Sequence, residues 1–339
     1  MTLCGQYTLA EIHSQPQAWV DALKVLESQK EAWQFFFREG NFDSVIFTGC
    51  GSMYNLPLAA SVIWQDVTGL PVRALPGSET WLNSEIIHAS SHPLLVSVSR
   101  SGTTTETIRA TRAFAGKTAT ISCCPEAELP TLGDFNLLLP SGQEDSIAQT
   151  RAFTTIYLAS IALAAFASGH DDLWNELQSL PALAEKLITR YESLARELGN
   201  DLSIDRFYFL GSGLRYGLAC ELNIKMKEMS LTHSEPFHVL EFRHGPKAMV
   251  TPSALVVGLL SDTQCSHEQA VLDDMRALGG RTLSLAESKA DVEFESGLSE
   301  IARSVLYLPV CQMIAYERSM AKGLNPDLPE NLTAFVELA

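Results

Sequence analysis

The chain alternates short apolar runs with longer amphipathic stretches over most of its length. Such runs predict buried strands of a parallel sheet, because strands covered on both faces are apolar throughout. The predicted strands are 45–48, 72–75, 94–99, 118–122 and 135–139 in the first half, and 207–210, 255–260, 282–285 and 305–308 in the second. Predicted helices include 18–38, 56–67, 106–114, 221–230 and 267–278. This alternation predicts an α/β fold with helices on both faces of a parallel sheet.

Two strand–turn–helix units share one pattern and lie about half a chain apart. The strand 45–48 runs into residues 49–54 (GCGSMY), and the strand 207–210 runs into residues 211–216 (GSGLRY). Both turns have the form G-x-G-x-x-Y and precede a helix. The repeat predicts two doubly wound parallel-sheet subdomains related by internal duplication.

The stretch between the two units is polar, with leucines at helical spacing, which predicts connecting helices. We therefore expect four parts along the chain. They are an N-terminal helical segment (1–40), a first, phosphate-binding subdomain (41–170), connecting helices (171–200), and a second subdomain with a C-terminal tail (201–339).

Composition narrows the classes of function and location. The 339 residues carry a net charge of −16, which argues against nucleic acid and anionic membrane surfaces as partners. We find no segment with the ~18 uncharged apolar residues of a membrane span, and no signal-peptide pattern at the start. Seven cysteines without C-x-x-C spacing argue for a reducing compartment. We expect a cytoplasmic protein.

The stretch Ser99-Arg100-Ser101-Gly102-Thr103-Thr104 lies between a predicted buried strand and a predicted helix. Backbone N–H groups at a helix N-terminus point outward, and the helix dipole favours negative charge there. The hydroxyls add donors, and a glycine allows close approach of the backbone. An ordinary helix N-cap explains one such hydroxyl. Several hydroxyls in one short turn favour an anion site, with phosphate as its expected guest.

Other phosphate-containing ligands fit the pattern less well. In the two G-x-G turns, Tyr54 and Tyr216 stand where a dinucleotide fingerprint has its third glycine, and no Walker lysine is present. We therefore expect no nicotinamide or ATP cofactor. The matching strand of the second half ends in Leu260-Ser261-Asp262, where the aspartate would repel an anion. One anion site per chain is predicted.

Acid–base candidates lie in the second half. If 221–230 is helical, Glu221, Lys225 and Glu228 share one face, which fits either a solvated ion-pair face or a proton-transfer site. His244 precedes a Gly-Pro turn, a position at an element end where catalytic residues often lie. A Glu and a His beside a phosphate pocket suggest proton transfer at a sugar carbon. No pair of histidines has metal-ligand spacing, so no metal is expected.

These motifs together resemble the SIS (sugar isomerase) family, and within it the isomerase half of the glutamine–fructose-6-phosphate transaminases and related phosphosugar deaminases and deglycases. The resemblance covers nearly the whole chain. It rests on residues 11–16 (EIHSQP), 49–55 (GCGSMYN), 99–107 (SRSGTTTET), 148–155 (AQTRAFTT), 221–228 (ELNIKMKE), 241–246 (EFRHGP) and 325–332 (NPDLPENL).

The resemblance implies a role for each matching residue. The residues expected to hold a 6-phosphate are Ser52, Ser99, Arg100 (through its backbone), Ser101 and Thr104. Those expected beside the sugar are Ala148, Thr333 and Lys225. Glu228 is expected to shuttle a proton between C1 and C2, and His244 to open the ring. In this family that histidine reaches the site of the neighbouring subunit, so the resemblance also implies a homodimer with shared active sites.

Three departures from the family pattern shape the expected reaction. No glutaminase domain is expected, Met53 replaces a hydroxyl residue, and Ala334 stands where the synthases have a lysine that can form a Schiff base. We therefore expect a phosphosugar isomerase or deaminase that acts on a hexose or aminohexose 6-phosphate or its amine adduct. A fructosamine-6-phosphate deglycase is the first alternative, since its substrate brings its own amine. A non-catalytic phosphosugar sensor is the second, although the acidic charge argues against DNA binding.

Overall fold

The computed structural model describes residues 4–83, 85 and 91–333. The chain folds into two compact units. We name them the N-sheet unit, with residues 14–144 and 151–181, and the C-sheet unit, with residues 4–13, 145–150 and 182–332. Residues 4–13 and the short segment 145–150 therefore group with the second sheet. The expected domain boundaries near residues 40, 170 and 200 stay predictions.

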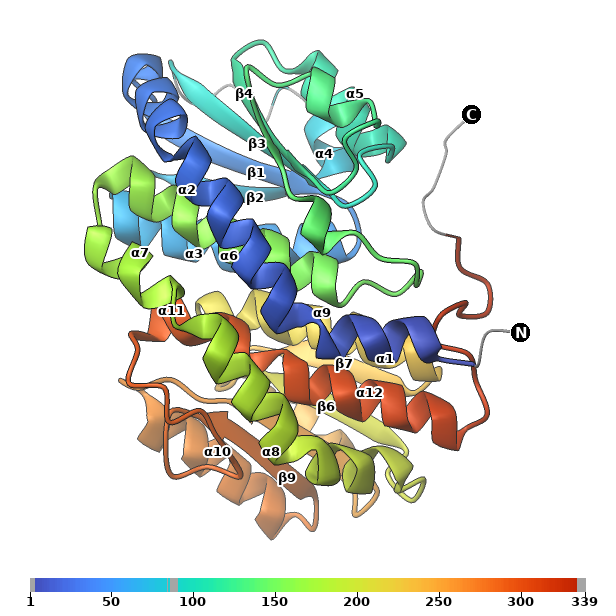
Figure 1. The fold of residues 1–339 in the computed structure, drawn as a ribbon. Coiled ribbons are helices and arrows are strands. Elements are labelled where there is room, and N and C mark those ends of the chain that lie inside the picture. The colour runs from blue at the N-terminus through green and yellow to red at the C-terminus, as the bar shows by residue number, and fades with distance from the viewer. Residues whose placement is uncertain (1–3, 84, 86–90, 334–339) are drawn as a thin grey trace. The chain divides into compact units, whose positions relative to one another are not determined.

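The N-sheet unit is built on a five-stranded parallel sheet in the order β2-β1-β3-β4-β5 (Figure 1). Its strands are β1 (Ser44–Gly49), β2 (Val72–Pro76), β3 (Pro93–Ser99), β4 (Lys117–Ser122) and β5 (Phe135–Leu138). Its helices are α2 (Gln15–Gly40), α3 (Ser52–Thr68), α4 (Gly77–Leu82), α5 (Thr105–Ala113), α6 (Arg151–Ser168) and α7 (Asp171–Leu177), with 3-10 turns η2 (Leu129–Thr131) and η3 (Pro140–Gly142). Helix α6 packs against α2 and α3, and α4 packs against α5.

The C-sheet unit has a second five-stranded parallel sheet, in the order β10-β9-β8-β6-β7. Its strands are β6 (Arg206–Leu210), β7 (His233–Phe237), β8 (Ala254–Leu259), β9 (Arg281–Ala286) and β10 (Val292–Glu293). Its helices are α1 (Gln6–His13), α8 (Leu180–Asn200), α9 (Leu214–Ser230), α10 (Cys265–Ala277), α11 (Glu300–Arg303) and α12 (Pro309–Ala321), with 3-10 turns η4 (Glu241–Arg243), η5 (Pro246–Met249) and η6 (Ser304–Tyr307). From the opposite edge, this order repeats that of the first sheet.

The predicted α/β fold of two doubly wound sheets is confirmed, and all but one of the predicted strands are present. The exception is 305–308, where the chain forms the 3-10 turn η6. A short buried apolar run has no periodicity that separates strand from helix, so the prediction was wrong there. Strands β7 and β10 were not predicted. Strand β7 is a polar edge strand that contains Pro236, and β10 is only two residues long.

The two G-x-G turns have the same backbone. Gly51 has φ 58° and ψ −128°, and Gly213 has φ 58° and ψ −132°, a region that other residues rarely adopt. The first glycine of each turn allows strand and helix to pack closely. A Cβ on Gly49 would lie 2.0 Å from the carbonyl oxygen of Met53. In the second turn, a Cβ on Gly211 would lie 2.3 Å from the carbonyl oxygen of Arg215. Identical turns and identical strand orders support the internal duplication.

Helix α6 is a long apolar helix that is buried inside its unit. By length and hydropathy it could cross a membrane, yet 83% of it is buried inside the structure. Three tryptophan indoles donate hydrogen bonds to it: Trp19 to the Thr154 hydroxyl at 3.1 Å, Trp33 to the Leu163 carbonyl at 2.9 Å and Trp64 to the Ser160 carbonyl at 2.9 Å. This helix therefore forms the core of the N-sheet unit.

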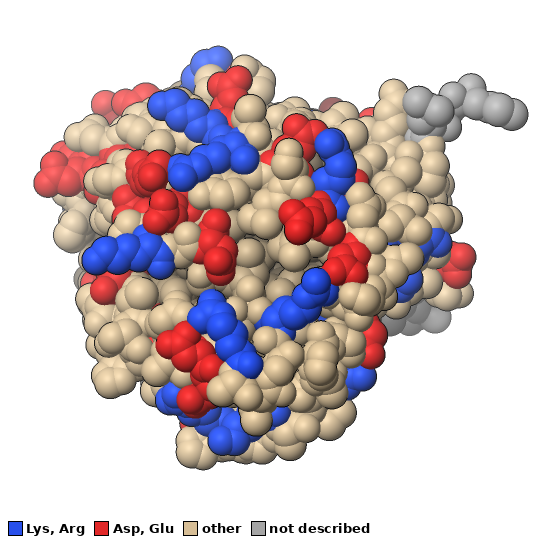
Figure 2. Space-filling model, turned by 90° about the horizontal axis from the view of Figure 1, so that it is seen from below, with Lys and Arg blue, Asp and Glu red and all other residues tan. Residues whose placement is uncertain are grey.

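Acidic and basic side chains are interspersed on the face drawn in Figure 2. The C-sheet unit also has local ion pairs, such as Arg276 with Asp273 at 2.6 Å and Arg281 with Asp201 at 2.7 Å. The excess of negative charge therefore does not form a single-sign field on this face.

Candidate active site

The predicted phosphate residues lie at the carboxyl ends of the neighbouring strands β1 and β3. In a sheet of this order, these strands flank the topological switch point, where doubly wound folds bind ligands. Ser52 opens helix α3 directly after the β1 turn, and Ser99 is the last residue of β3. The structure therefore brings Ser52 and the loop 99–104 to neighbouring strand ends of the N-sheet unit. Their role in phosphate binding stays a prediction.

Hydrogen bonds among hydroxyls shape the 99–104 loop, which we call the hydroxyl loop. The Ser99 hydroxyl accepts from the backbone N–H of Gly102 at 3.1 Å and lies 3.3 Å from the Thr104 hydroxyl. The Ser101 hydroxyl accepts from the backbone N–H of Thr103 at 3.2 Å. Gly102 has φ +66°, and a Cβ there would lie 2.6 Å from Cβ of Ala127. The loop is therefore tightly turned, and only glycine fits at its centre.

No side-chain hydrogen bond caps the start of helix α5, whose first turn also contains Glu106. Thr104 is the N-cap residue, yet its side chain makes no capping hydrogen bond. The first N–H groups of a helix have no acceptor within the helix. Within the described ranges, the Ser52 hydroxyl also has no hydrogen-bond partner. This arrangement disfavours the ordinary N-cap interpretation and fits an anion site built from backbone dipoles and hydroxyls.

Arg100 contributes to the hydroxyl loop through its backbone. Its carbonyl accepts from the N–H of Cys123 at 3.1 Å and from the Ser122 hydroxyl at 3.3 Å. Its buried guanidinium lies 3.8 Å from a carboxylate oxygen of Glu144. Glu144 also accepts from the N–H of Arg151 at 2.6 Å. Glu144 thus ties the loop to the first turn of α6, a role that sequence reasoning missed.

The cysteine that donates to the hydroxyl loop, Cys123, is buried. Burial raises the pKa of the Cys123 thiol far above its ordinary value, and the neighbouring Glu144 raises it further. Burial also raises the pKa of Cys124. Thiolates are the reactive forms of cysteine, so the raised pKa values disfavour a nucleophilic role for these adjacent thiols at neutral pH.

Helix α9 presents the predicted acid–base group. Lys225, 1% exposed, places its Nζ 2.5 Å from Oε2 of Glu228 and 3.6 Å from Oε1 of Glu221. The side chain of Glu221 is fully buried, whereas that of Glu228 is 20% exposed. The shared face is confirmed, but it is not a solvated ion-pair face. A buried ammonium flanks Glu228, whose carboxylate still reaches solvent.

The remaining predicted residues lie in three other places. Ala148 is buried in the segment 145–150 of the C-sheet unit. His244 is exposed at the end of η4, before Gly245 with φ +121°. Thr333 is exposed at the end of the described chain, and Ala334 lies outside the described residues.

The segment 145–150 is held by the Glu11 carboxylate and the Asp327 backbone carbonyl, which sequence reasoning did not single out. Glu11 accepts from the N–H groups of Asp145 at 2.6 Å and Ser146 at 3.1 Å. Asp327 accepts from the N–H and hydroxyl of Thr8, both at 2.8 Å, and its carbonyl accepts from the N–H of Ile147 at 3.0 Å. The partners are far apart in sequence, so no spacing signals them. The only signal was that Glu11 and Asp327 lie inside motifs of the resemblance.

The switch point of the C-sheet unit is filled by side chains. Oε2 of Glu268 accepts from the N–H of Ser261 at 2.6 Å, and its Oε1 lies 3.2 Å from Nη2 of Arg215. The other guanidinium nitrogens of Arg215 reach the Leu259 carbonyl and the Glu300 carboxylate. A carboxylate of the chain itself thus occupies the loop that matches the hydroxyl loop.

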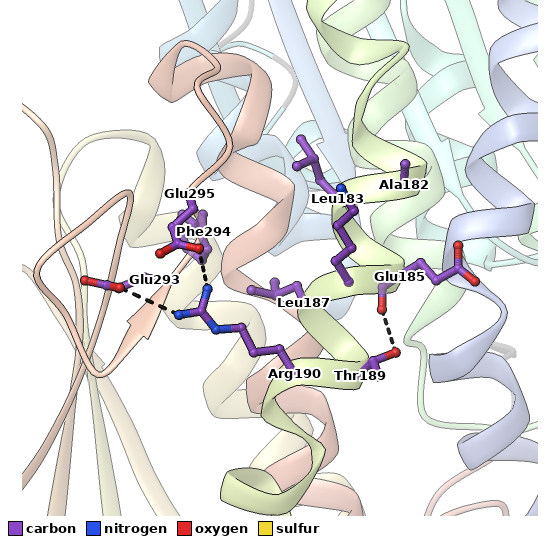
Figure 3. Close-up of a pocket in the computed structure, with 10 residues that line it drawn as sticks. Ala182, Leu183, Glu185, Leu187, Thr189, Arg190, Glu293, Phe294 and Glu295 are labelled. Carbon is purple, nitrogen blue, oxygen red and sulfur yellow. Dashed lines mark hydrogen bonds and ion pairs between the residues drawn. The ribbon is translucent and has the colours of Figure 1, made fainter.

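A hollow of about 590 Å³ lies elsewhere in the C-sheet unit, between α8 and the segment 293–295. Figure 3 shows Arg190 pointing to Glu293 and Glu295, with which it pairs at 3.8 and 2.5 Å. Leu183, Leu187 and Phe294 form its apolar wall. None of the predicted site residues lines this hollow.

Comparison with known proteins agrees with the resemblance found in the motifs. Residues 202–293 match the family model described as the SIS domain. The resemblance to this family is therefore confirmed over these residues.

Curated relatives and solved structures agree with this class. The chain is 23% identical, over 97% of its length, to glutamine–fructose-6-phosphate aminotransferase [isomerizing] of Methanothermobacter thermautotrophicus, and 28% identical to that of Sulfurisphaera tokodaii, also over 97%. It spans only 57% and 56% of the length of these relatives. Glucosamine-6-phosphate deaminase from Thermotoga maritima matches with TM-score 0.77 and 28% identity, over 94% of this chain and all of that one. Tagatose-6-phosphate ketose/aldose isomerase from Escherichia coli shares the fold, with TM-score 0.82, 21% identity, and coverage of 97% of this chain and 96% of that one.

Proposed function

We propose that this protein is a cytoplasmic phosphosugar isomerase or deaminase that acts on a hexose or aminohexose 6-phosphate. The observation that most supports this proposal is the Glu228 carboxylate, held against the buried ammonium of Lys225 and still partly open to solvent. A fixed carboxylate that reaches solvent is suited to moving a proton to and from carbon. The named relatives act on phosphorylated sugars, which agrees with the hydroxyl loop as the place for phosphate.

In this proposal the chain's residues divide the work. The hydroxyl loop and Ser52 hold the 6-phosphate, His244 assists ring opening, and Glu228 removes the proton from C2 of the open-chain sugar and returns it to C1. An aldose phosphate becomes a ketose phosphate by this transfer. With a 2-amino sugar, the same transfer gives an imine at C2, which takes up water and releases ammonia. We further propose a homodimer, since the family resemblance assigns His244 to the neighbouring subunit.

A fructosamine-6-phosphate deglycase is the second candidate, and one sequence feature favours it. Ala334 replaces the lysine with which the synthases form a Schiff base. A substrate that already contains a C1 amine needs no such lysine. Proton transfer from C1 to C2 by Glu228 would give an aldimine, which water cleaves to an aldose phosphate and the free amine.

A substrate screen by mass spectrometry tests the proposed function. The panel comprises glucosamine 6-phosphate, galactosamine 6-phosphate, fructose 6-phosphate with ammonia, and fructosamine 6-phosphates, each beside its unphosphorylated counterpart. We expect conversion of at least one phosphorylated compound and of none of the unphosphorylated ones. Release of ammonia identifies a deaminase, and release of the adduct's amine identifies a deglycase. Binding of the phosphosugars without any conversion would overturn the enzymatic proposal in favour of a sensor.

A further inference from the structure

Arg100 is the one basic residue of the hydroxyl loop, and its side chain lies inside the fold. The residue is 5% exposed, and its Nη1 lies 3.8 Å from Oε2 of Glu144, whose side chain is fully buried. A buried guanidinium that lacks a carboxylate partner is strongly unfavourable, because it has lost its hydration without compensation. Glu144 therefore helps to hold the Arg100 side chain in the interior.

The same carboxylate connects this guanidinium to the core of the N-sheet unit. Oε1 of Glu144 accepts from the backbone N–H of Arg151, the first residue of α6, at 2.6 Å. The Arg151 side chain donates in turn to the hydroxyl of Ser14, which precedes α2, at 2.8 Å. Arg100, Glu144 and Arg151 all belong to the N-sheet unit. Glu144 thus bridges the hydroxyl loop and the buried helix α6.

The backbone of Arg100 lies between the two serines that order the loop. Ser99 and Ser101 are its neighbours in the chain, and their hydroxyls accept from backbone N–H groups within the loop. The Arg100 carbonyl accepts from the Cys123 N–H at 3.1 Å and from the Ser122 hydroxyl at 3.3 Å. Because Arg100 is almost fully buried, its guanidinium can reach solvent only if the backbone on either side of it moves. The positions of both serine hydroxyls therefore depend on how firmly Arg100 is held.

We propose that Glu144 is a positioning residue for the anion site, which holds the hydroxyl loop in its phosphate-binding conformation through Arg100. This inference rests on the proposed function, from which it takes phosphate as the ligand. It adds a residue that acts on the ligand without contacting it, since the buried guanidinium transmits its effect to the loop.

The sign of the effect on binding distinguishes this role from a purely electrostatic one. Glu144→Gln removes one negative charge beside a site for an anion, and it keeps a side-chain oxygen that can accept from the N–H of Arg151. If Glu144 acted only through its charge, this change would strengthen anion binding. A positioning role predicts weaker binding, because the Arg100 guanidinium loses the carboxylate that holds it in place.

Calorimetric titration of the full chain with inorganic phosphate and with sorbitol 6-phosphate measures this effect. We expect Glu144→Gln to weaken both ligands by about tenfold. Arg100→Met and the double variant Arg100→Met/Glu144→Gln should weaken them by a similar factor, because the two residues act as one unit. The double variant leaves neither charge unpaired, so it reports on binding even if a single variant fails to fold.

Glu128→Gln is the matched control for the loss of charge. It removes a carboxylate from another ion pair of the N-sheet unit, in which Glu128 and Arg112 pair at 2.7 Å with side chains that are 41% and 60% exposed. Exposed pairs contribute little to the fold, so both affinities should stay within about twofold of those of the unmodified chain.

Hydrogen exchange of the free protein reports on the loop without any ligand. The N–H groups of Gly102 and Thr103 donate to the loop's own serine hydroxyls. In Glu144→Gln, we expect the peptide that contains them to exchange at least roughly fivefold faster, while a peptide from the centre of β3 keeps its rate. Equal acceleration of both peptides would show a general loss of stability and would overturn the positioning role.

The outcomes of the titration separate the inference from the function on which it rests. If the unmodified chain binds neither phosphate ligand, the proposed function fails and the inference fails with it. If the unmodified chain binds them and Glu144→Gln binds them equally well or more tightly, the inference fails while the proposed function stands. Losses that multiply in the double variant would show that Glu144 does not act through Arg100, and would also overturn the inference.

Discussion

Each unit has a topological switch point, and the loops at these two points provide different partners for their backbone N–H groups. The loop after β3 in the N-sheet unit presents hydroxyls, a glycine and an open helix start. The loop after β8 in the C-sheet unit holds the carboxylate of Glu268 on the N–H of Ser261, with Arg215 behind it. In the C-sheet unit, Glu268 occupies the position at which we propose that an external anion binds in the N-sheet unit.

Strand register identifies the residues that differ. Val45 pairs with Leu94 in the first sheet, and Phe207, at the same distance from its G-x-G turn, pairs with Leu255 in the second. Counting forward from these pairs matches Ser101 with Asp262, Met53 with Arg215 and Thr107 with Glu268. Three substitutions thus convert a polar, open loop into a charged and closed one.

The closed loop belongs to a wider ion network in the C-sheet unit. Its acidic members outnumber its basic ones, so it repels a further anion. The network consists of Arg215, Arg303, Asp262, Glu268, Glu287 and Glu300. The prediction of one anion site per chain was based on Asp262 alone. The other carboxylates of this network add negative charge that disfavours a second site.

The largest expected effect comes from opening the closed loop. Glu268→Ala leaves the buried guanidinium of Arg215 with fewer partners and should lower the free energy of unfolding by about 3 kcal/mol. Chemical denaturation measures this loss. The control is the double variant Arg215→Met/Glu268→Thr, which carries the counterparts from the N-sheet unit and should recover most of the stability. A loss below about 1 kcal/mol for Glu268→Ala would show that the pair does not hold this loop.

A smaller loss is expected from crowding the hydroxyl loop. Gly102→Ala combines φ +66° with a Cβ that would lie 2.6 Å from Cβ of Ala127, and should cost about 2 kcal/mol in unfolding free energy. Gly69→Ala is the matched control, since Gly69 has φ +73° but nothing within 4 Å of an added Cβ. It should cost about 1 kcal/mol. Equal losses in both variants would contradict the close packing of this loop.

Removal of hydroxyls from the same loop should affect binding more than stability. Ser101→Ala and Thr104→Ala should each weaken a hexose 6-phosphate about tenfold, because hydrogen bonds to a charged group contribute roughly 1.5–3 kcal/mol. Affinity for the unphosphorylated sugar should stay the same. Thr263→Ala in the matching loop of the C-sheet unit is the control and should change neither. Titration calorimetry showing equal losses for both sugars would argue against a phosphate role.

The smallest expected effect concerns the chemical reactivity of Cys50, which lies in the first of the two G-x-G turns. Cys50 matches Ser212, whose hydroxyl accepts from the N–H of Val239 at 3.3 Å. Burial raises the pKa of the Cys50 thiol, so the fraction of thiolate at pH 8 is lower than for an ordinary cysteine. Iodoacetamide should therefore modify Cys50 more slowly than the exposed Cys4, as peptide mass spectrometry can measure. Equal rates would show that the β1 turn is open to solvent.

The fold was largely predictable from the sequence, because buried parallel strands leave apolar runs and the two turns repeat. The failures have physical causes. The run 305–308 has no alternation of apolar and polar residues that would separate strand from helix, and it forms η6. Strand β7 is a polar edge strand that is held by its pairing with β6. Neither outcome follows from local pattern, since neighbours distant in sequence determine both.

The candidate site was predictable only in part. Helical spacing placed Glu221, Lys225 and Glu228 together, and a strand–helix turn placed the hydroxyl loop. The sequence could not reveal that Glu144 fixes Arg100, or that Glu11 and Asp327 fix the segment 145–150. Those contacts join residues separated by long stretches of chain, and only the folded structure brings them together.

The central claim is that Glu228 transfers a proton between C1 and C2 of a phosphosugar. Proton NMR in D₂O of the full chain with glucosamine 6-phosphate or fructose 6-phosphate follows the exchange of the C1 and C2 hydrogens directly. We predict exchange with the unmodified chain and at least a roughly hundredfold slower exchange with Glu228→Gln, while the dissociation constant for the sugar phosphate changes less than about threefold. Undiminished exchange in Glu228→Gln would contradict this claim.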